Sequence, residues 1–285
     1  MAPVSFRKDY KEGGIRLDKL IITVAPVGAE ATRQDNPNLP LTPEEIAQEV
    51  VMCAEKGASI VHLHVRDEEG KATQSRGVFE KTIQLIKKEC NVILQVSTGG
   101  AAWMTPEERL QPVTLKPEMA TLTTGTVNFG EDVFSNPPGV IEHFAREISA
   151  CGVKPEIEVF DVGMIQNALN LVKRGIISLP LHFDFVMGVP GGIPGDPRHL
   201  LHLVESIPEG CTWSVAGIGR FELPLGTMAI LLGGNVRVGF EDNIFYKKGV
   251  LAENNAQLVE QISRLSGELG RVVATPDEAR KILGL

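Results

Sequence analysis

Short apolar runs and amphipathic helical patterns alternate eight times along this chain, and this alternation limits the folds that it can adopt. The runs that we expect to form strands cover residues 20–27, 58–65, 91–100, 119–128, 154–161, 179–188, 211–219 and 235–242. Each is followed by a helical pattern, and these begin near residues 41, 77, 105, 137, 164, 196, 223 and 252. Strands that alternate with helices run parallel, and eight such units favour a closed (β/α)₈ barrel, a TIM barrel, over an open sheet.

The length of the chain agrees with one barrel. It has 285 residues, of which 43% are hydrophobic, so a large core can form without disulfides or a structural metal. Two small domains would also fit this length, but no linker or shift in composition divides the sequence. We therefore expect a single domain over residues 1–285, with residues 1–18 as an N-terminal extension or a plug over the barrel.

Charge and composition exclude several functions. The net charge of −8 gives no support for binding nucleic acid or a membrane surface, although an anionic substrate stays possible because local fields differ from the net charge. The sequence contains no apolar run of 18 residues, and its first residues lack the apolar segment of a signal peptide. The four cysteines form no CxxC pair, so we expect reduced thiols and a cytoplasmic protein.

Polar residues gather where the predicted strands end. In a TIM barrel the active site is built from the carboxyl ends of the strands and the loops after them, so these residues are the candidates for chemistry. In chain order they are Glu30, His62, His64, Arg66, Asp67, Ser97–Gly100, Thr121, Thr123, Thr124, Glu156, Glu158, His182, Asp184, Arg237, Glu241 and Asp242.

His62 and His64 form a His-x-His pair on the second predicted strand. Side chains alternate along a strand, so both imidazoles face the same side. Two buried imidazoles repel each other when both are charged, and a divalent metal removes that conflict, since zinc takes histidine nitrogens together with a carboxylate in open catalytic sites. The alternative is a pair of polar side chains that form hydrogen bonds inside the barrel.

A third ligand can come from the end of the eighth strand. In a closed barrel, the second and eighth strands both flank the first, so Glu241 or Asp242 can reach the histidines. Adjacent side chains diverge, so we expect one of the two to bind metal and the other to face the substrate as a base. Both could instead be solvated loop acids. His182 is a competing ligand, but its strand lies across the barrel from the second.

Arg237 lies within the eighth predicted strand, where a buried charge requires a partner. It can keep Asp242 ionised, bind an anionic group, or form a purely structural ion pair. The Gly-rich turns at 97–100 and 188–192 offer backbone N–H groups suited to a carboxylate or phosphate, although such turns are also common without a ligand. Neither a GxSxG elbow, a Walker loop nor a GxGxxG fingerprint is present.

These motifs together resemble the β-keto acid cleavage enzyme family. The matching stretches run from about residue 20 to the C-terminus and include VHLHVRD (61–67), STGG (97–100), GVPGG (188–192) and GFEDN (239–243). The resemblance implies a zinc-dependent TIM barrel that condenses a β-keto acid with acetyl-CoA to give acetoacetate and a new acyl-CoA. It also implies a homotetramer.

The resemblance assigns a role to each candidate residue. His62, His64 and Glu241 would bind one Zn²⁺ per subunit, Asp242 would be the catalytic base, and Arg237 would orient that base. The substrate site would include Glu30, Ser97, Gly99, Gly100 and Thr121, with Glu158 at the far end of the keto acid. Zinc would polarise the ketone oxygen while Asp242 removes the proton from the carbon between the ketone and the carboxylate.

The charge of Glu158 suggests the substrate. A carboxylate at the distal end favours an ammonium group, as in 5-amino-3-oxohexanoate of lysine fermentation, and a quaternary ammonium keto acid would also fit. If Glu158 instead pairs with an internal Arg or Lys, another keto acid becomes possible. Two other hypotheses about function remain, a CoA-independent zinc aldolase or lyase and a non-catalytic barrel that senses a small acid.

Overall fold

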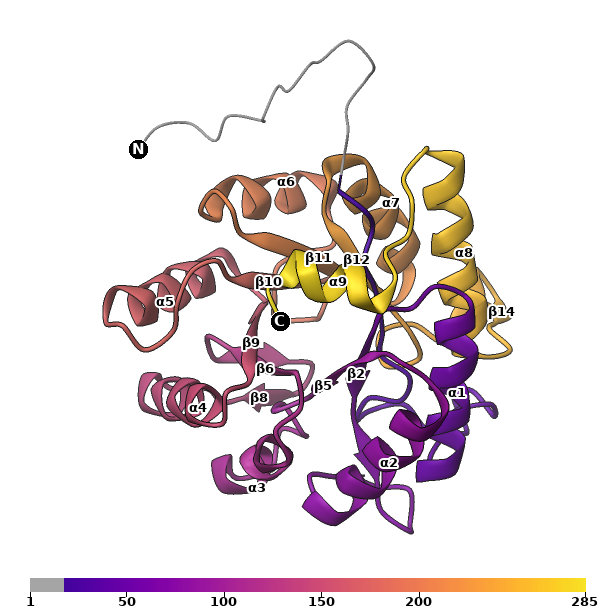
Figure 1. Ribbon diagram of the computed structural model, residues 1–285, viewed down its shortest axis with the longest axis horizontal. Helices are drawn as coiled ribbons and strands as arrows, with labels where there is room; N and C mark the ends of the chain where they lie inside the picture. The colour runs from indigo at the N-terminus through magenta and orange to yellow at the C-terminus, as the bar shows by residue number, and fades with distance from the viewer. Residues whose placement is uncertain (1–17) are drawn as a thin grey trace.

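A computed structural model describes residues 18–285 and contains the predicted barrel. Eight parallel strands close into a ring in the order β1-β2-β5-β6-β9-β10-β11-β12 (Figure 1). Their bounds are β1 (Ile22–Val24), β2 (Ile60–Leu63), β5 (Ile93–Val96), β6 (Met119–Thr123), β9 (Lys154–Val159), β10 (His182–Met187), β11 (Thr212–Gly217) and β12 (Asn235–Val238). The prediction of a (β/α)₈ barrel is confirmed.

Helices surround the ring and cover its outer face (Figure 1). They are α1 (Pro43–Glu55), α2 (Arg76–Glu89), α3 (Pro106–Leu110), α4 (Pro138–Ala150), α5 (Val162–Lys173), α6 (Pro197–Ser206), α7 (Glu222–Leu232) and α8 (Asn255–Glu268), followed by α9 (Pro276–Leu283). Short 3₁₀ turns lie at Gln111–Leu115 and Gly219–Phe221. The main hydrophobic core lies between the strands and this outer layer of helices.

Three helices begin with the same local signal. Thr42, Thr105 and Thr275 each precede a proline at the first helical position and a glutamate three residues on. In each case the threonine hydroxyl accepts the backbone N–H of that glutamate, whose carboxylate accepts the threonine N–H in return. This capping box satisfies N–H groups that a helix end otherwise leaves unpaired, so the start of α1, α3 and α9 is encoded locally.

All eight predicted runs extend beyond the strand that forms within them, and three of them continue into a hairpin or a turn. The run at 58–65 stops at Leu63, and β3 (Val65–Arg66) then pairs with β4 (Ala72–Thr73) in a hairpin. The run at 119–128 stops at Thr123, and β7 (Val127–Phe129) forms a hairpin with β8 (Asp132–Phe134). The run at 235–242 stops at Val238 and turns. At all three points the chain leaves the barrel wall. After β2 and β6, the remainder of the extended run forms a hairpin outside the ring.

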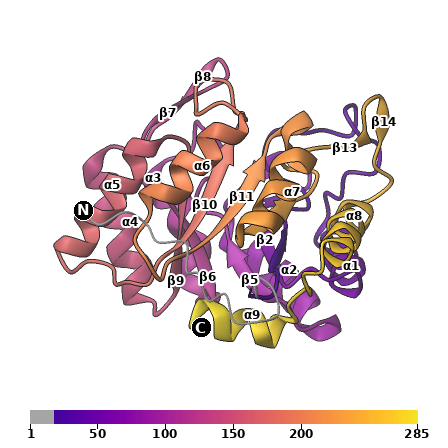
Figure 2. The same cartoon turned by 90° about the horizontal axis from the view of Figure 1, so that it is seen from above.

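The barrel interior is stratified. At its amino-terminal end, Ile21, Ile60, Ile93 and Met119 pack against Ala279 and Leu283 of α9. Figure 2 shows α9 lying across this end of the barrel. Above this apolar floor the inward side chains are polar, whereas barrel interiors are usually filled with Val, Ile and Leu. These buried polar residues include His62, Gln95, Thr121, Glu156, His182, Ser97, Glu158, Asp184, Ser214 and Arg237.

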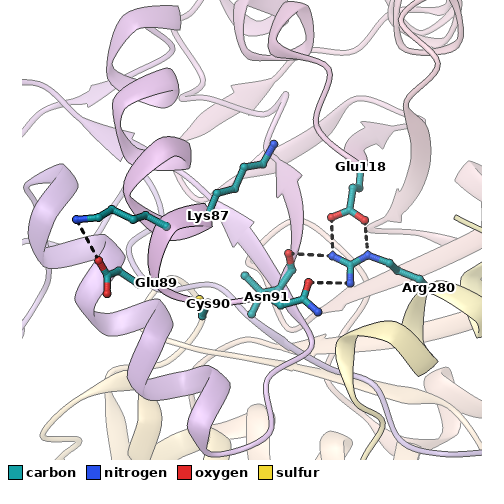
Figure 3. Close-up of a pocket in the computed structure, with 8 residues that line it drawn as sticks. Lys87, Glu89, Cys90, Asn91, Glu118 and Arg280 are labelled. Atoms are coloured by element: carbon teal, nitrogen blue, oxygen red, sulfur yellow. Dashed lines mark hydrogen bonds and ion pairs between the residues drawn. The ribbon is translucent and has the colours of Figure 1, made fainter.

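Helix α9 is tied to the barrel through an ion pair. The guanidinium of Arg280 donates to both carboxylate oxygens of Glu118, at 2.6 and 3.0 Å, and to Asn91 Oδ1 at 3.0 Å (Figure 3). These residues line a shallow hollow together with Lys87 and Glu89. Arg280 pairs with Glu118, and Lys88 pairs with Glu89, which indicates a structural role, in line with the usual role of this end of a TIM barrel.

The expected N-terminal extension falls on residues 1–18, of which 1–17 lie outside the described residues. At its end, the guanidinium of Arg271 donates to the carbonyl of Asp18 at 2.7 Å. Two more strands, β13 (Phe245–Lys247) and β14 (Val250–Leu251), form a hairpin in the loop between β12 and α8.

Candidate active site

A cavity of about 470 Å³ opens at the carboxyl ends of the strands. Predicted site residues line it from several loops, as do three phenylalanines that no motif singled out. The polar lining residues are Glu30, His64, Ser97, Glu131, Asp132, Glu158, Arg237, Glu241 and Asp242, and the phenylalanines are Phe129, Phe134 and Phe160. Gly99 and Gly100 also face it, while His62 and Thr121 do not.

His62, His64 and Glu241 form a cluster whose geometry fits a metal ion. The rings of the two histidines lie 5.2 Å apart, and Glu241 Oε1 lies 3.4 Å from His62 Nε2 and 3.6 Å from His64 Nε2. One ligand atom from each residue lies within 4.8 Å of the others. His62 Nε2 and Glu241 Oε2 are buried without a hydrogen-bond partner, which is costly unless a cation is bound there. Two imidazoles and a carboxylate suit zinc.

The topology explains how these three residues meet. Strand β1 pairs with β2 on one side and β12 on the other, so the ends of β2 and β12 lie close across it. His62 belongs to β2 and His64 follows it, while Glu241 lies on the turn after β12. Asp242, the other carboxylate considered for the metal, points instead to Arg237.

The protonation of the cluster reflects its neighbours. Burial and the charge of Arg237 disfavour a charged His62, but Glu241 outweighs them and raises the pKa of His62 to about 9. Burial lowers the pKa of His64 to about 4. Burial raises the pKa of Glu241, yet Arg237 and the two histidines hold it well below its usual range. Glu241 is therefore a carboxylate, ready to bind a cation.

Arg237 is the centre of a buried ion network. Its guanidinium donates to both oxygens of Asp242, at 2.8 and 2.9 Å, and to Glu241 at 2.6 Å. It also lies 3.4 Å from Asp184 and 3.7 Å from Glu158. The two-pronged contact fixes the orientation of Asp242, as planar guanidinium–carboxylate pairs do. Burial raises the pKa of Asp242 to about 6, although Arg237 opposes this shift.

A buried glutamate that the sequence motifs did not identify holds the turn after β12. Glu222 accepts the backbone N–H of Gly239 at 3.1 Å and the side-chain amide of Asn243 at 2.9 Å. The N–H of Glu241 donates to Ala25 O at 3.1 Å. These contacts fix both ends of the turn that carries Glu241 and Asp242, and they depend on residues far apart in the sequence.

The turn after β5 is also fixed by hydrogen bonds. The N–H of Gly99 donates to Ser97 Oγ at 3.1 Å, and the N–H of Thr98 donates to Thr121 Oγ1 at 3.0 Å. Thr121 is fully buried, so its hydroxyl supports the turn from behind. Gly100 has a φ of +61°, a conformation that glycine adopts without strain.

Glu158 meets both expectations, a place in the substrate cavity and a pairing with an internal arginine. It lines the cavity, and it also accepts the hydroxyl of Thr123 at 2.5 Å and lies near Arg237. Burial raises its pKa above the ordinary value. Glu30 lies at the exposed rim, on a loop whose carbonyls at Gly28 and Ala31 accept hydrogen bonds from Arg66.

The sequence motifs missed Gln95 and treated Asp184 only as one candidate among many. Gln95 faces the barrel interior opposite His62, since the two residues are register partners on β5 and β2. Asp184 accepts the Ser214 hydroxyl at 2.7 Å, and burial raises its pKa to about 7. Their position in the sequence could have identified them, because Gln95 and Asp184 lie two residues before Ser97 and Val186, which line the cavity, and side chains two apart on a strand face the same side.

No helix among residues 18–285 is both long and apolar enough to cross a membrane. Residues 19–285 match the model of the beta-keto acid cleavage enzyme family. A "3-keto-5-aminohexanoate cleavage enzyme" from Fusobacterium nucleatum subsp. nucleatum is 53% identical over 271 residues, which cover 94% of this chain and 99% of that one.

A second relative, "3-oxoadipate:acetyl-CoA acetyltransferase" from Cupriavidus necator, is 40% identical over 269 residues, or 93% of this chain and 94% of that one. Among solved structures, a ternary complex of ObcA with a C4-CoA adduct and oxalate superposes with a TM-score of 0.74 at 22% identity, over 87% of this chain and 68% of that one. That likeness shows a common fold. By the family match and the identity to these relatives, the chain belongs to the β-keto acid cleavage enzymes.

Proposed function

We propose that this β-keto acid cleavage enzyme is zinc-dependent and acts on 5-amino-3-oxohexanoate. It would condense this keto acid with acetyl-CoA to give acetoacetate and 3-aminobutanoyl-CoA, as in lysine degradation. The observation that carries the proposal is the cluster of His62, His64 and Glu241 beside the Arg237–Asp242 pair. The relative from Fusobacterium nucleatum, named for the same keto acid, supports the choice of substrate.

His62, His64 and Glu241 would hold the zinc ion, through two ring nitrogens and a carboxylate oxygen. A zinc ion bound there supplies a Lewis acid that polarises the ketone of the substrate. His64 and Glu241 line the cavity, so a metal ion held by them would be accessible to a substrate bound there. The buried, unpartnered His62 Nε2 and Glu241 Oε2 support this assignment.

Asp242 would remove a proton from the carbon between the ketone and the carboxylate. With a pKa raised to about 6 by burial, it is largely ionised at neutral pH and yet basic enough to accept a proton. Arg237 holds both of its oxygens and so orients it toward the cavity. The carbanion would then attack the acetyl carbon of acetyl-CoA and release the CoA thiolate, which would attack the original ketone. The carbon–carbon bond to that ketone would break, and the resulting acetoacetate carbanion would take the proton back from Asp242.

The two ends of the substrate would meet different groups. The Ser97 hydroxyl and the N–H groups of Gly99 and Gly100 would bind the carboxylate, with Thr121 supporting their turn from behind. Glu158 would face the ammonium group at the distal end. Glu30 at the rim would complete the substrate site. This arrangement requires no nucleophilic side chain, because the substrate carbanion and the CoA thiolate are the nucleophiles.

One observation favours a second candidate substrate. Glu158 already contacts Thr123 and Arg237, so its charge is partly compensated without a substrate ammonium. A β-keto acid with a neutral or anionic end would then be accepted, and the Cupriavidus necator relative, named for 3-oxoadipate, is an example of the anionic kind. A CoA-independent zinc lyase is the other alternative, since it would need the same metal and base.

An isotope experiment separates these possibilities. Zinc-loaded protein is incubated with 5-amino-3-oxohexanoate and acetyl-CoA labelled with ¹³C on both acetyl carbons, and the products are analysed by mass spectrometry. We expect both labelled carbons in acetoacetate and an unlabelled 3-aminobutanoyl-CoA. If the enzyme converts 3-oxoadipate or 3-oxohexanoate but not 5-amino-3-oxohexanoate, the proposed substrate is wrong. Cleavage without consumption of acetyl-CoA would reject the reaction.

We further propose that the enzyme is a cytoplasmic homotetramer with one barrel domain per chain. The four cysteines are free thiols, which supports a reducing compartment. The side chains of Trp103 and Val133 are more than half exposed, as expected for apolar groups that an assembly covers. Light scattering coupled to size exclusion tests the proposal, and we expect a mass of four chains.

A further inference from the structure

The ring nitrogen of His62 that faces away from the metal cluster has a defined partner. His62 Nδ1 lies 2.7 Å from Gln95 Oε1. An amide oxygen can only accept, so Nδ1 carries a proton in this contact. When His62 is neutral, as a metal ligand must be, this leaves the lone pair on Nε2, the nitrogen that lies nearest Glu241. Gln95 thus selects the tautomer that can bind a metal through Nε2.

The orientation of the Gln95 amide is fixed by its surroundings. Gln95 is fully buried, and its register partner on β2 is His62. Burial raises the pKa of Glu156, but His182 and the Gln95 amide outweigh it, so the pKa is lowered and Glu156 is a carboxylate. An amide turned the other way would direct its oxygen towards this carboxylate, which is repulsive. Gln95 Nε2 and both Glu156 oxygens are buried without a hydrogen-bond partner, so the two groups attract each other as charged and polar neighbours and not through a formed hydrogen bond.

Glu156 is itself held in place. His182 Nε2 lies 3.3 Å from Glu156 Oε2, and His182 Nδ1 lies 2.8 Å from the hydroxyl of Thr212. The row therefore runs from Thr212 through His182, Glu156 and Gln95 to His62, across the polar layer above the apolar floor. Each member lies on a strand of the barrel wall, so the row has little freedom to move.

We propose that Gln95 is a positioning residue that fixes the tautomer and the ring orientation of His62 for metal binding, with Glu156 orienting the Gln95 amide. The inference rests on the proposed zinc site. Partners of this kind behind a ligating histidine typically account for about 10- to 100-fold in metal affinity.

Two variants test the role of Gln95. Gln95→Leu removes the acceptor, and we expect zinc to bind about 10- to 100-fold more weakly, as measured by competition with a chromophoric chelator. The double variant Gln95→Glu/Glu156→Gln exchanges carboxylate and amide. It keeps an acceptor for His62 Nδ1–H, a donor beside it and the same net charge. We expect this double variant to bind zinc with an affinity within about 3-fold of that of the unmodified enzyme, because it keeps the hydrogen-bond acceptor behind His62.

A second readout needs no metal. The chain has six histidines, so selective ¹⁵N labelling gives a simple spectrum. In the metal-free enzyme we expect an exchange-protected Nδ1–H resonance that disappears in His62→Gln and in Gln95→Leu and returns in the double variant, whereas the signals of the buried His182 ring stay in His62→Gln. If Gln95→Leu fails to fold, the double variant alone decides, because it must bind zinc and show this resonance.

The outcomes are distinct. Unchanged zinc affinity in folded Gln95→Leu, or a double variant as weak as Gln95→Leu, would overturn the inference. If the unmodified enzyme binds no zinc, the proposed metal site is wrong, while the Nδ1–H resonance still reports on the Gln95 contact. A zinc-binding enzyme without that resonance would reject the role of Gln95 and leave the zinc site intact.

Discussion

At the scale of single residues, the balance of charge around Arg237 favours a cation in the site. One guanidinium faces four carboxylates, those of Asp184, Glu158, Glu241 and Asp242. Burial raises the pKa of three of them, because their charged forms are poorly solvated there, and a single guanidinium cannot neutralise all four carboxylates. A divalent ion on Glu241 would supply the missing positive charge and free Arg237 to hold Asp242.

Removal of a proposed ligand should abolish metal binding. In His62→Ala we expect zinc to be lost on dialysis and turnover to fall by more than the roughly 100-fold that loss of a supporting residue causes. Elemental analysis and the acetoacetate assay measure the two effects. His143→Ala is the matched control, because that histidine lies half-exposed on α4. An active, zinc-free His62→Ala enzyme would contradict the ligand assignment.

Substitution of the proposed base should separate chemistry from metal binding. Asp242→Asn keeps the shape of the side chain but accepts no proton, so we expect bound zinc to be retained while kcat falls by about 10²- to 10⁴-fold. Zinc content and steady-state kinetics on the same preparation test this. Unchanged kcat would exclude Asp242 as the base.

The distal carboxylate should determine the preference for charge. In Glu158→Gln we expect kcat/KM for 5-amino-3-oxohexanoate to fall by about 10- to 100-fold, the size of a hydrogen bond to a charged group. Neutral 3-oxohexanoate should change little, so the ratio of the two values is the measurement. Equal losses for both substrates would assign Glu158 to the Arg237 network alone.

At the scale of elements, the loops at the carboxyl ends of the strands depend on close approaches between backbones. Gly239, at the start of the turn after β12, has a φ of +143°, and a Cβ there would lie 2.2 Å from Ala25 O. This approach allows the N–H of Glu241 to reach Ala25 O. The barrel closure between β1 and β12 and the placement of Glu241 thus depend on one glycine.

We therefore expect Gly239→Ala to destabilise the protein by about 1–3 kcal/mol or more and to weaken zinc binding, because the turn must move. Gly267→Ala is the control, since that glycine lies in α8 with open space around it, and alanine there should stabilise the helix by up to about 1 kcal/mol. Urea unfolding measures both. Equal stability of the two variants would mean that the turn tolerates the side chain.

At the scale of the whole molecule, the barrel is built around a polar interior. The apolar core lies between strands and helices, and the barrel lumen holds an apolar floor closed by α9 beneath layers of polar groups, several of which are titratable. Stability therefore comes mainly from the outer shell, and the lumen should make the free energy of unfolding depend on pH.

Asp184 gives this pH dependence a definite sign. Its pKa is about 7 in the folded protein against 3.8 for an ordinary aspartate, so between these values the folded state binds a proton that the unfolded state has lost. Its contribution to the free energy of unfolding is full below about pH 4 and is lost as the pH rises to about 7, an effect on the order of 4 kcal/mol.

In Asp184→Asn this loss is absent, so the stability of the variant relative to the unmodified metal-free enzyme should rise steadily from pH 4 to pH 7 and then level off. Urea unfolding of both proteins at matched pH values gives the difference. Parallel stability curves over that range would show that Asp184 does not titrate there.

Periodicity and local hydrogen bonds in the sequence are enough to predict the elements and to identify the candidate residues. Eight apolar runs set the (β/α)₈ barrel, three Thr-Pro-x-Glu segments set the starts of α1, α3 and α9, and alternation along one strand placed His62 and His64 on the same face. These are local consequences of periodicity and of hydrogen bonds between residues close in the chain, so a single sequence is enough to predict them.

Which of these side chains contact one another depends on the tertiary structure. Glu241 and Asp242 are adjacent acids in the sequence, yet the turn after β12 directs Glu241 to the histidines and Asp242 to Arg237. The contact between Gln95 and His62 follows from the register of β5 against β2, and the hairpins that shorten the predicted strands follow from where the barrel wall ends. Register and closure depend on the packing of all eight units together, and no local segment carries that information.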